Sequence, residues 1–399
     1  MIIKEKKTMK SYKCSGALKA ATFVSLFFAA TAGLTQQLFW TDGNLFAIKR
    51  APLAGGDATV VLQGKNYTHL AFDPMTRLLY FAIGDPVPML YRCQPDGTHQ
   101  QLLLTLDTHN YVRGMAIDAV GGKIYWSSSD GYVAGNGKIR RANLDGTGVE
   151  DLVTGMIYPY AMAIDMASGK MFWIRQELDS IWRANLDGSN PESLIPLGSS
   201  SYAFCLALDT ARAQLYWTDP GNQMIGRANL DGSDAHQIAP LDYGSLDAGI
   251  TVDAGPEGQW RSIGQPLAII GGGGGTTNNT NNGSASLFWA DTINHQVYSS
   301  ALDGSGAHVF RDTDPNYAQN LLVIRNWETA VSIARAQQGL RLSWNSRAGL
   351  AYRVQASSNR TDTSWVDISG RLTASGSTTS WSDTNALSTS QRFYRVLKE

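Results

Sequence analysis

The hexapeptide Arg-Ala-Asn-Leu-Asp-Gly occurs three times in this chain of 399 residues, at 141–146, 183–188 and 227–232. The copies begin 42 and then 44 residues apart. A period of about 40–45 residues is typical of a propeller blade built from four strands. In each copy Asp-Gly supplies the turn of a tight hairpin, because glycine adopts positive φ without steric cost. The repeat therefore predicts an all-β propeller.

Two further patterns recur with the same period. Six predicted strands end in an aromatic pair: Phe39-Trp40, Tyr80-Phe81, Tyr125-Trp126, Phe172-Trp173, Tyr216-Trp217 and Phe288-Trp289. Small apolar segments that end in aspartate precede most of these pairs, with the aspartate at Asp73, Asp118, Asp165, Asp209 and Asp253. One repeat therefore consists of three strands, the Asp-Gly turn and a fourth strand. We expect the small apolar strands innermost, and the aromatic pairs packed between neighbouring blades.

The first repeat lacks a small apolar strand of its own. The segment 317–324, after the last Asp-Gly turn, aligns with 202–209, which contains such a strand. This alignment predicts that residues 321–324 pair beside residues 38–40, so that segments from both ends of the repeat share one blade. Such pairing joins the two ends of the ring and covers exposed strand edges.

The segments Leu-Phe-Trp-Thr-Asp at 38–42 and Leu-Tyr-Trp-Thr-Asp at 215–219 resemble the YWTD repeats of the low-density-lipoprotein-receptor class. The resemblance covers roughly residues 38–326 and implies a six-bladed β-propeller. Three repeats depart from the pattern, with Ala82-Ile83, Ser127-Ser128 and Ile174-Arg175 in place of Thr-Asp. The chain also lacks the EGF-like modules that flank the animal receptors, so the resemblance does not carry receptor function.

A different composition begins near residue 328. Alternating apolar and polar residues at 340–344, 352–355 and 393–396 are typical of half-buried antiparallel strands. Residues 329–399 are therefore predicted to form a small β-sandwich. Its final Phe-Tyr-Arg-Val segment resembles the C-terminal fibronectin-III-like or immunoglobulin-like modules of secreted bacterial proteins.

Residues 1–32 are predicted to be a signal peptide, with either Met1 or Met9 as the start. A lysine-rich segment is followed by the apolar run Ala20–Ala30, and Ala30-Thr31-Ala32 is a cleavage signal. The run is too short to span a bilayer, which takes about 20 residues. Removal of residues 1–32 takes away six lysines and one glutamate, which leaves 27 basic and 33 acidic residues. This balance argues against nucleic-acid binding, and we expect a monomer that is secreted or held at the cell surface.

No catalytic motif is visible in the sequence. The six histidines show no zinc-ligand spacing, and neither a Gly-x-Ser-x-Gly nor a Cys-x-x-Cys motif occurs. We therefore predict no cofactor and no metal, and the two cysteines of the propeller, Cys93 and Cys205, are expected to be packed thiols. Carboxylates after the aromatic strands are expected on one face of the ring, where each would accept backbone N–H bonds in its own turn rather than hold calcium: Asp42, Asp85, Asp130, Glu177, Asp219 and Asp291.

Tyrosines stand before several innermost strands. Four of them lie seven residues before the final aspartate of that strand or its equivalent: Tyr111, Tyr158, Tyr202 and Tyr317. Together with Arg113 and Tyr160, they are predicted to surround the mouth of the central channel as a ligand-binding site. Tyrosine combines an apolar ring with a polar tip, which suits recognition surfaces. The alternative is that these rings only cover the core.

The sequence thus favours a non-enzymatic binding protein for an extracellular protein or glycan. An extracellular hydrolase or lyase with a site at the channel mouth is the first alternative, and a structural component of an envelope or matrix is the second. The fold alone does not choose among them.

A glycine- and asparagine-rich insertion at about 255–286 lengthens the last interval between aromatic pairs to 72 residues. Replacement of residues 258–284 by a short Gly-Ser turn should leave the melting temperature within a few degrees, because loop entropy grows slowly with length. Thermal unfolding of the two chains checks this. A large drop would show that Trp260 or the segment 267–270 belongs to the core.

Overall fold

The computed structural model describes two compact units, within Ala30–Glu328 and within Thr329–Glu399. The described residues are 37–399, except 53–55, 85, 109, 130–134, 242–249, 254–285, 292–293, 295, 314–317, 325–330, 336–338, 358–364 and 386–392. The predicted signal peptide, nearly all of the predicted insertion, Tyr317 and the predicted domain boundary near 326–329 lie outside them. In the described residues no helix is both long and apolar enough to cross a membrane.

Six four-stranded antiparallel sheets make up the described part of the first unit, and we number them as blades 1 to 6. The first strands of blades 1 to 6 are β24 (Ala318–Ile324), β4 (Tyr67–Asp73), β8 (Tyr111–Asp118), β12 (Pro159–Asp165), β16 (Leu206–Asp209) and β20 (Ile250–Asp253). The second strands are β1 (Gln37–Asp42), β5 (Leu78–Ile83), β9 (Lys123–Ser129), β13 (Lys170–Arg175), β17 (Gln214–Asp219) and β21 (Ser286–Asp291).

The outer half of each blade follows in the same order. The third strands are β2 (Ala47–Pro52), β6 (Met89–Cys93), β10 (Gly137–Asn143), β14 (Ser180–Asn185), β18 (Met224–Asn229) and β22 (Gln296–Ala301). The fourth strands are β3 (Thr59–Gln63), β7 (Gln101–Thr105), β11 (Glu150–Met156), β15 (Glu192–Pro196), β19 (His236–Pro240) and β23 (His308–Asp312). One short 3₁₀ helix, η1 (Gln176–Leu178), links the second and third strands of blade 4.

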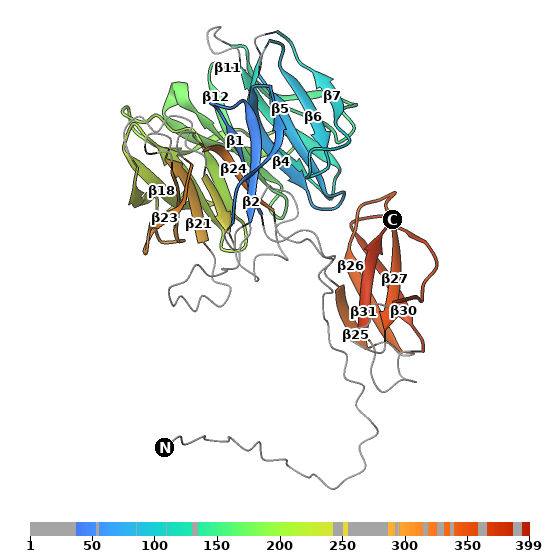
Figure 1. Ribbon diagram of the computed structural model, residues 1–399. Helices are drawn as coiled ribbons and strands as arrows, with labels where there is room; N and C mark the ends of the chain where they lie inside the picture. The colour runs from blue at the N-terminus through green and yellow to red at the C-terminus, as the bar shows by residue number, and fades with distance from the viewer. Residues whose placement is uncertain are drawn as a thin grey trace, which may run out of the picture. The chain divides into compact units, whose positions relative to one another are not determined.

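The first strands form the inside of a closed ring. Each of them contacts the first strand of the next blade, and β20 contacts β24, so the series returns to its start. β24 pairs with β1 in blade 1, with Val323 opposite Leu38 and Leu322 opposite Phe39 (Figure 1). The predicted closure is therefore confirmed. The all-β propeller prediction is also confirmed.

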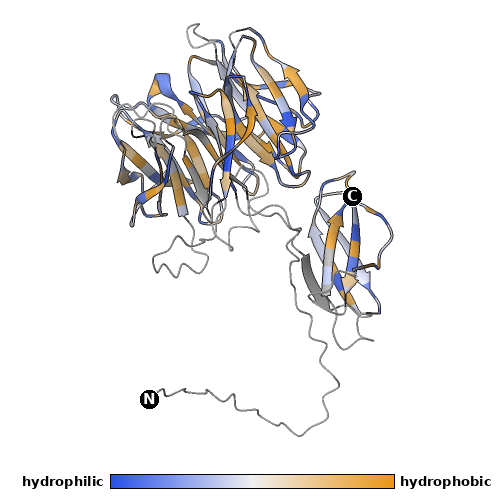
Figure 2. Cartoon of the chain, viewed as in Figure 1, coloured by the Kyte–Doolittle hydropathy of each residue, from blue (hydrophilic) through white to orange (hydrophobic). Residues whose placement is uncertain are grey.

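The aromatic strands pack between the blades, as their recurrence predicts. Trp40, Trp126, Trp173 and Trp217 are all at most 2% exposed. Trp217 and Phe172, from blades 5 and 4, belong to one apolar cluster. Figure 2 shows apolar and polar residues succeeding each other along the strands. The indole rings are therefore core residues rather than surfaces for a ligand.

The repeated hexapeptide joins one blade to the next. Its arginine donates a hydrogen bond to the leucine carbonyl of the following copy: Arg141 Nη1 to Leu186 at 3.3 Å, and Arg183 Nη1 to Leu230 at 3.1 Å. Arg92 in blade 2 donates in the same way to Leu144, at 2.9 Å. The hexapeptide therefore forms a junction between blades as well as a turn.

The glycine of the hexapeptide contacts the preceding blade, on the side opposite to the arginine hydrogen bond. Gly188 has φ +85°, and a Cβ atom there would overlap the carbonyl oxygen of Leu152 in the preceding blade. At Gly146 a Cβ atom would lie 2.5 Å from the Leu103 carbonyl oxygen. Glycine therefore fills two requirements here: a left-handed turn and direct contact between two backbones.

The C-terminal unit contains two small sheets on one apolar core. β26 (Leu340–Asn345) pairs with β25 (Val331–Arg335) and β30 (Thr378–Asp383), and β27 (Ala351–Ser357) pairs with β28 (Val366–Asp367), β29 (Leu372–Thr373) and β31 (Phe393–Lys398). Trp344 and Val354, one from each sheet, lie in this core. The resemblance to fibronectin-III or immunoglobulin modules stays a prediction.

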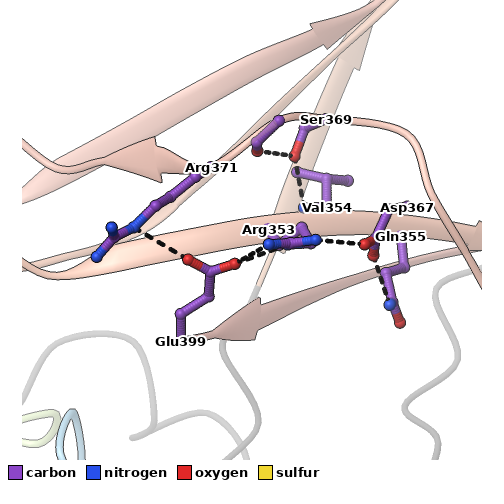
Figure 3. Close-up of polar contacts among 8 residues, drawn as sticks. Arg353, Val354, Gln355, Asp367, Ser369, Arg371 and Glu399 are labelled. Atoms are coloured by element: carbon purple, nitrogen blue, oxygen red, sulfur yellow. Dashed lines mark hydrogen bonds and ion pairs between the residues drawn. The ribbon is translucent and has the colours of Figure 1, made fainter.

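An exposed ion-pair network ties the last residue of the chain to this unit. Arg353 pairs with Asp367 at 2.6 Å and with Glu399, which also pairs with Arg371 at 3.1 Å (Figure 3). Exposed pairs contribute little to stability, typically about 0–1 kcal/mol, so the unit depends mainly on its apolar core.

The two roles of the junction glycine can be separated by a pair of substitutions. Gly155 has φ +80°, but open space surrounds it. Gly155→Ala should cost about 1–2 kcal/mol for the left-handed backbone alone. Gly188→Ala should cost about 1–3 kcal/mol more, because the new methyl group also overlaps the Leu152 backbone. Denaturant unfolding measures both, and equal losses would contradict the junction role.

Candidate functional site

The candidate site lies where the inner strands begin, at the end of the ring that we call the tyrosine face. Four inner strands, β4, β8, β12 and β24, carry register shifts typical of β-bulges near this end, and those of β8 and β12 hold predicted site residues. Arg113 is an extra residue between the Val112–Ser128 and Gly114–Ser127 pairs of blade 3. In blade 4, Tyr160 lies within a register shift between Pro159 and Met162. A bulge re-aims the side chain that it carries and is common next to functional sites.

The bulged residues belong to a continuous row of side chains. The Arg113 guanidinium carbon lies 5.6 Å from the Tyr111 ring centroid and 5.5 Å from the Tyr160 centroid. The Tyr160 ring packs edge-to-face on Phe204, with centroids 5.2 Å apart, and Phe204 packs in the same way on Tyr202 at 4.8 Å. We call these five residues the aromatic row. It crosses blades 3 and 4 and ends at the entry to blade 5.

The loops that carry the row are held by carboxylates. Glu177 accepts hydrogen bonds from the backbone N–H groups of Ile157 and Tyr158, at 3.3 and 3.2 Å. Asp219 accepts one from Tyr202 N–H at 2.8 Å. Each of these acids follows the aromatic strand of its blade and binds the loop that enters the inner strand of the same blade.

The prediction that these acids accept backbone N–H bonds in their own turns is confirmed for Asp42 and Asp219, whereas the backbone N–H groups that bond to Glu177 belong to the preceding loop. Asp42 accepts from Asn44 and Leu45 N–H within its own turn. Asp85, Asp130 and the Asp291 side chain lie outside the described residues. In the described part of the chain, no group of three or more His, Cys, Asp or Glu residues is placed to hold a metal ion.

The structure brings four of the predicted site residues together: Tyr111, Arg113, Tyr160 and Tyr202. Tyr158 lies on the same face, where its backbone bonds to η1 through Gln176 N–H. Tyr202 is the most open of them, at 43% exposure, and the rest are half-buried. Tyr67, in the equivalent part of blade 2, instead packs in the core against Phe81, and burial raises the pKa of its hydroxyl.

Sequence reasoning missed Phe204, which links Tyr160 to Tyr202. The signal was present, because Phe204 follows Tyr202 at the spacing at which Tyr160 follows Tyr158. It also missed Ser127, whose hydroxyl donates to the Tyr160 carbonyl at 2.7 Å and so joins β9 of blade 3 to the bulged β12 of blade 4. No repeat pattern points to this serine, since it replaces the threonine of other blades.

The third missed residue is His69, on the inner strand of blade 2. Its ring makes a hydrogen bond with the backbone of Arg113, and its Nδ1 atom is buried without a partner in the described residues. Desolvation, and next the positive charge of Arg113, lower the pKa of His69 to about 3. This imidazole is therefore neutral near pH 7.

The remaining reactive groups lie elsewhere. His99, His236 and His308 are exposed, and His236 and His308 occupy equivalent places after Asp-Gly turns. Cys93 and Cys205 are thiols and not disulfide halves. Burial raises the pKa of Cys93 to about 12, which leaves this thiol unreactive at neutral pH.

Known proteins share parts of this architecture. Residues 214–254 match the family described as low-density lipoprotein receptor repeat class B. Low-density lipoprotein receptor-related protein 5 of Mus musculus is 31% identical over 165 residues, which are 39% of this chain and 10% of that protein. The aligned region thus spans about a tenth of the length of this relative.

Two solved structures have a similar fold. A chain of a nidogen/laminin complex aligns with a TM-score of 0.55 at 20% identity, and covers 72% of this chain and 97% of its own. TolB from Acinetobacter baumannii aligns with a TM-score of 0.51 at 11% identity, over 73% of this chain and 67% of its own. At these identities the two structures support the propeller fold alone.

The neutral His69 generates a prediction about stability and pH. Its pKa is 6.5 in the unfolded chain and about 3 in the folded protein, so the unfolded state binds the additional proton between these values. The contribution of neutral His69 to the free energy of unfolding is therefore fully present above pH 6.5 and is lost as the pH falls toward 3. Between pH 7.5 and pH 5 the loss should be about 2 kcal/mol.

His69→Gln should remove this slope, and His99→Gln on an exposed turn should keep it. Denaturant unfolding at several pH values above 5 checks both, because the acids of the protein titrate mainly below that range. An unchanged slope in His69→Gln would show that the folded protein accepts a charged His69.

Proposed function

We propose that this protein is a secreted, non-enzymatic binding protein whose tyrosine face holds an extracellular protein or glycan. The observation that carries the proposal is the aromatic row of Tyr111, Arg113, Tyr160, Phe204 and Tyr202. Tyrosine and arginine are enriched among the few residues that carry most of the binding energy in interfaces. Here they form one group instead of being scattered.

The frame around the row supports the same proposal. Edge-to-face packing and bonded loops hold the rings before any ligand arrives, so less side-chain entropy is lost on binding. Gly114 adds to this rigidity, because a Cβ atom there would lie 2.5 Å from the Met162 backbone nitrogen of blade 4. Blades 3 and 4 are therefore in direct backbone contact beneath Arg113 and Tyr160.

The opposite end of the ring, the Asp-Gly face, offers less to a ligand. Asp187 accepts bonds from the backbone and hydroxyl of Ser189, at 2.9 and 2.6 Å, and these bonds hold its pKa below the ordinary value. Asp231 makes the same bonds with Ser233. Carboxylates that are already bonded within their own turns have less capacity to bind a partner.

Enzymatic chemistry finds less support in the described residues of the tyrosine face. Glu177 and Asp219 are engaged with backbone N–H groups, so neither is poised as an acid or base. The relative from mouse is named as a receptor-related protein, and one structural neighbour belongs to a complex of two proteins. Both names fit a binding role, with the C-terminal unit as a spacer or an attachment module.

Protein and glycan arrays probed with the chain would test the proposal. For any ligand found, Tyr202→Ala and Tyr158→Ala should weaken affinity at least about tenfold without unfolding the protein, since truncation of one anchor typically costs about 2 kcal/mol or more. Asp187→Ala and Asp231→Ala are the matched controls on the Asp-Gly face, and their affinity should stay unchanged. If the two aspartate variants lost affinity and the two tyrosine variants kept it, the binding site would lie on the Asp-Gly face and the proposal would be wrong.

A further inference from the structure

Arg113 has neither an acidic partner nor a side-chain hydrogen bond among the described residues, whereas arginines such as Arg92 and Arg311 at least donate to neutral acceptors. Arg141 pairs with Glu150 at 2.7 Å, and Arg175 pairs with Glu177 at 2.7 Å. For Arg113, no carboxylate in the described part lies within ion-pair distance, and its Nε atom is buried with no hydrogen-bond partner. Its guanidinium lies against two tyrosine rings instead.

An arrangement of this kind is costly unless an anion joins it. A half-buried charge loses part of its hydration, and a ring contact replaces only some of that loss. The Nε–H group is a strong hydrogen-bond donor, and buried donors of this kind normally have an acceptor. Neutral His69, beside Arg113, adds no competing charge at neutral pH.

A second donor lies beside the row. Ser129 pairs with Tyr111 across β8 and β9, and its hydroxyl is buried without a partner in the described residues. A serine hydroxyl donates one hydrogen bond, and a guanidinium donates up to five in one plane. These groups match a planar acceptor with a single negative charge.

We propose that the tyrosine face binds a carboxylate group, with Arg113 as its counter-charge. This inference rests on the proposed binding function and names the ligand chemistry of the same site. Arginine matches the planar carboxylate with paired N–H donors, and the single guanidinium balances its single charge. The carboxylate belongs to an aspartate or glutamate side chain of a protein, because tyrosine and arginine together are typical anchors of protein interfaces.

The test compares acidic probes with their neutral counterparts. Peptides that contain aspartate are set against the same peptides with asparagine, and oligogalacturonate is set against its methyl ester. The full chain should prefer the aspartate peptides over their asparagine counterparts about tenfold or more. A preference for oligogalacturonate over its methyl ester without a preference among the peptides would overturn the assignment to a protein carboxylate. Equal binding of both members of every pair would overturn the proposal.

Variants at one position then assign the preference. Arg113→Gln should abolish it, whereas Arg113→Lys, which keeps the charge but loses the planar fork, should retain part of it. Arg183→Gln, on an arginine already paired with Glu192, is the matched control and should keep the full preference. A preference that survives Arg113→Gln would overturn the assignment to Arg113.

Thermal unfolding separates this role from a structural one. If Arg113 is held for a ligand, its replacement removes a half-buried charge that no carboxylate among the described residues balances, so the melting temperature of Arg113→Gln should be equal or higher. A lower melting temperature with the acid preference intact would show that Arg113 only supports the two rings.

Failure of the inference and failure of the proposed function give different results. If Tyr202→Ala weakens binding but no acidic probe is preferred, the tyrosine face binds a neutral ligand and the inference is wrong. If neither Tyr202→Ala nor Arg113→Gln changes binding, the tyrosine face is not the site and both are wrong.

Discussion

The propeller depends on a direct contact between backbones at its blade junctions, five of which lie in the described residues. The glycine of an Asp-Gly turn lies against the carbonyl of an outer strand in the preceding blade, as Gly146 does at Leu103 and Gly232 at Leu194. Any side chain would separate the two blades. The adjoining arginine adds a hydrogen bond in the other direction along the ring, from Arg183 to Leu230. Repetition of the hexapeptide is therefore repetition of one joint.

This joint leaves the opposite face available for variation. Asp-Gly turns and outer strands hold the blades together at one end and along the rim, and the buried tryptophans fill the space between the sheets. The inner strands can then accept bulges at their beginnings without loss of the ring. Arg113 and Tyr160 lie on two such bulges. A rigid frame with irregular strand ends is how all-β folds commonly present a site.

Polar groups are satisfied differently at the two ends. On the Asp-Gly face each aspartate is bonded within its own turn, as Asp187 is by Ser189. On the tyrosine face some acids bind neighbouring loops, and Arg113, Ser129 and His69 each keep a buried atom without a partner in the described residues. Buried polar groups are normally paired, so an accumulation of such atoms at one place points to a ligand or to ordered water.

The sequence alone determined the period, the order of strands, the closure of the ring by residues 317–324 and the burial of the tryptophans. Each of these follows from a local pattern that recurs in every blade, and the same local physics acts at each copy. Only the tertiary structure decided how the site is assembled. The aromatic row joins residues from three blades, and it requires bulges and a ring, Phe204, that no single repeat specifies. The neutral state of His69 likewise depends on its burial beside Arg113, a residue 44 positions away in the chain. Unlike the repeated joint, the contacts of the aromatic row involve residues that differ from one repeat to the next, so no repeated pattern in the sequence could reveal them.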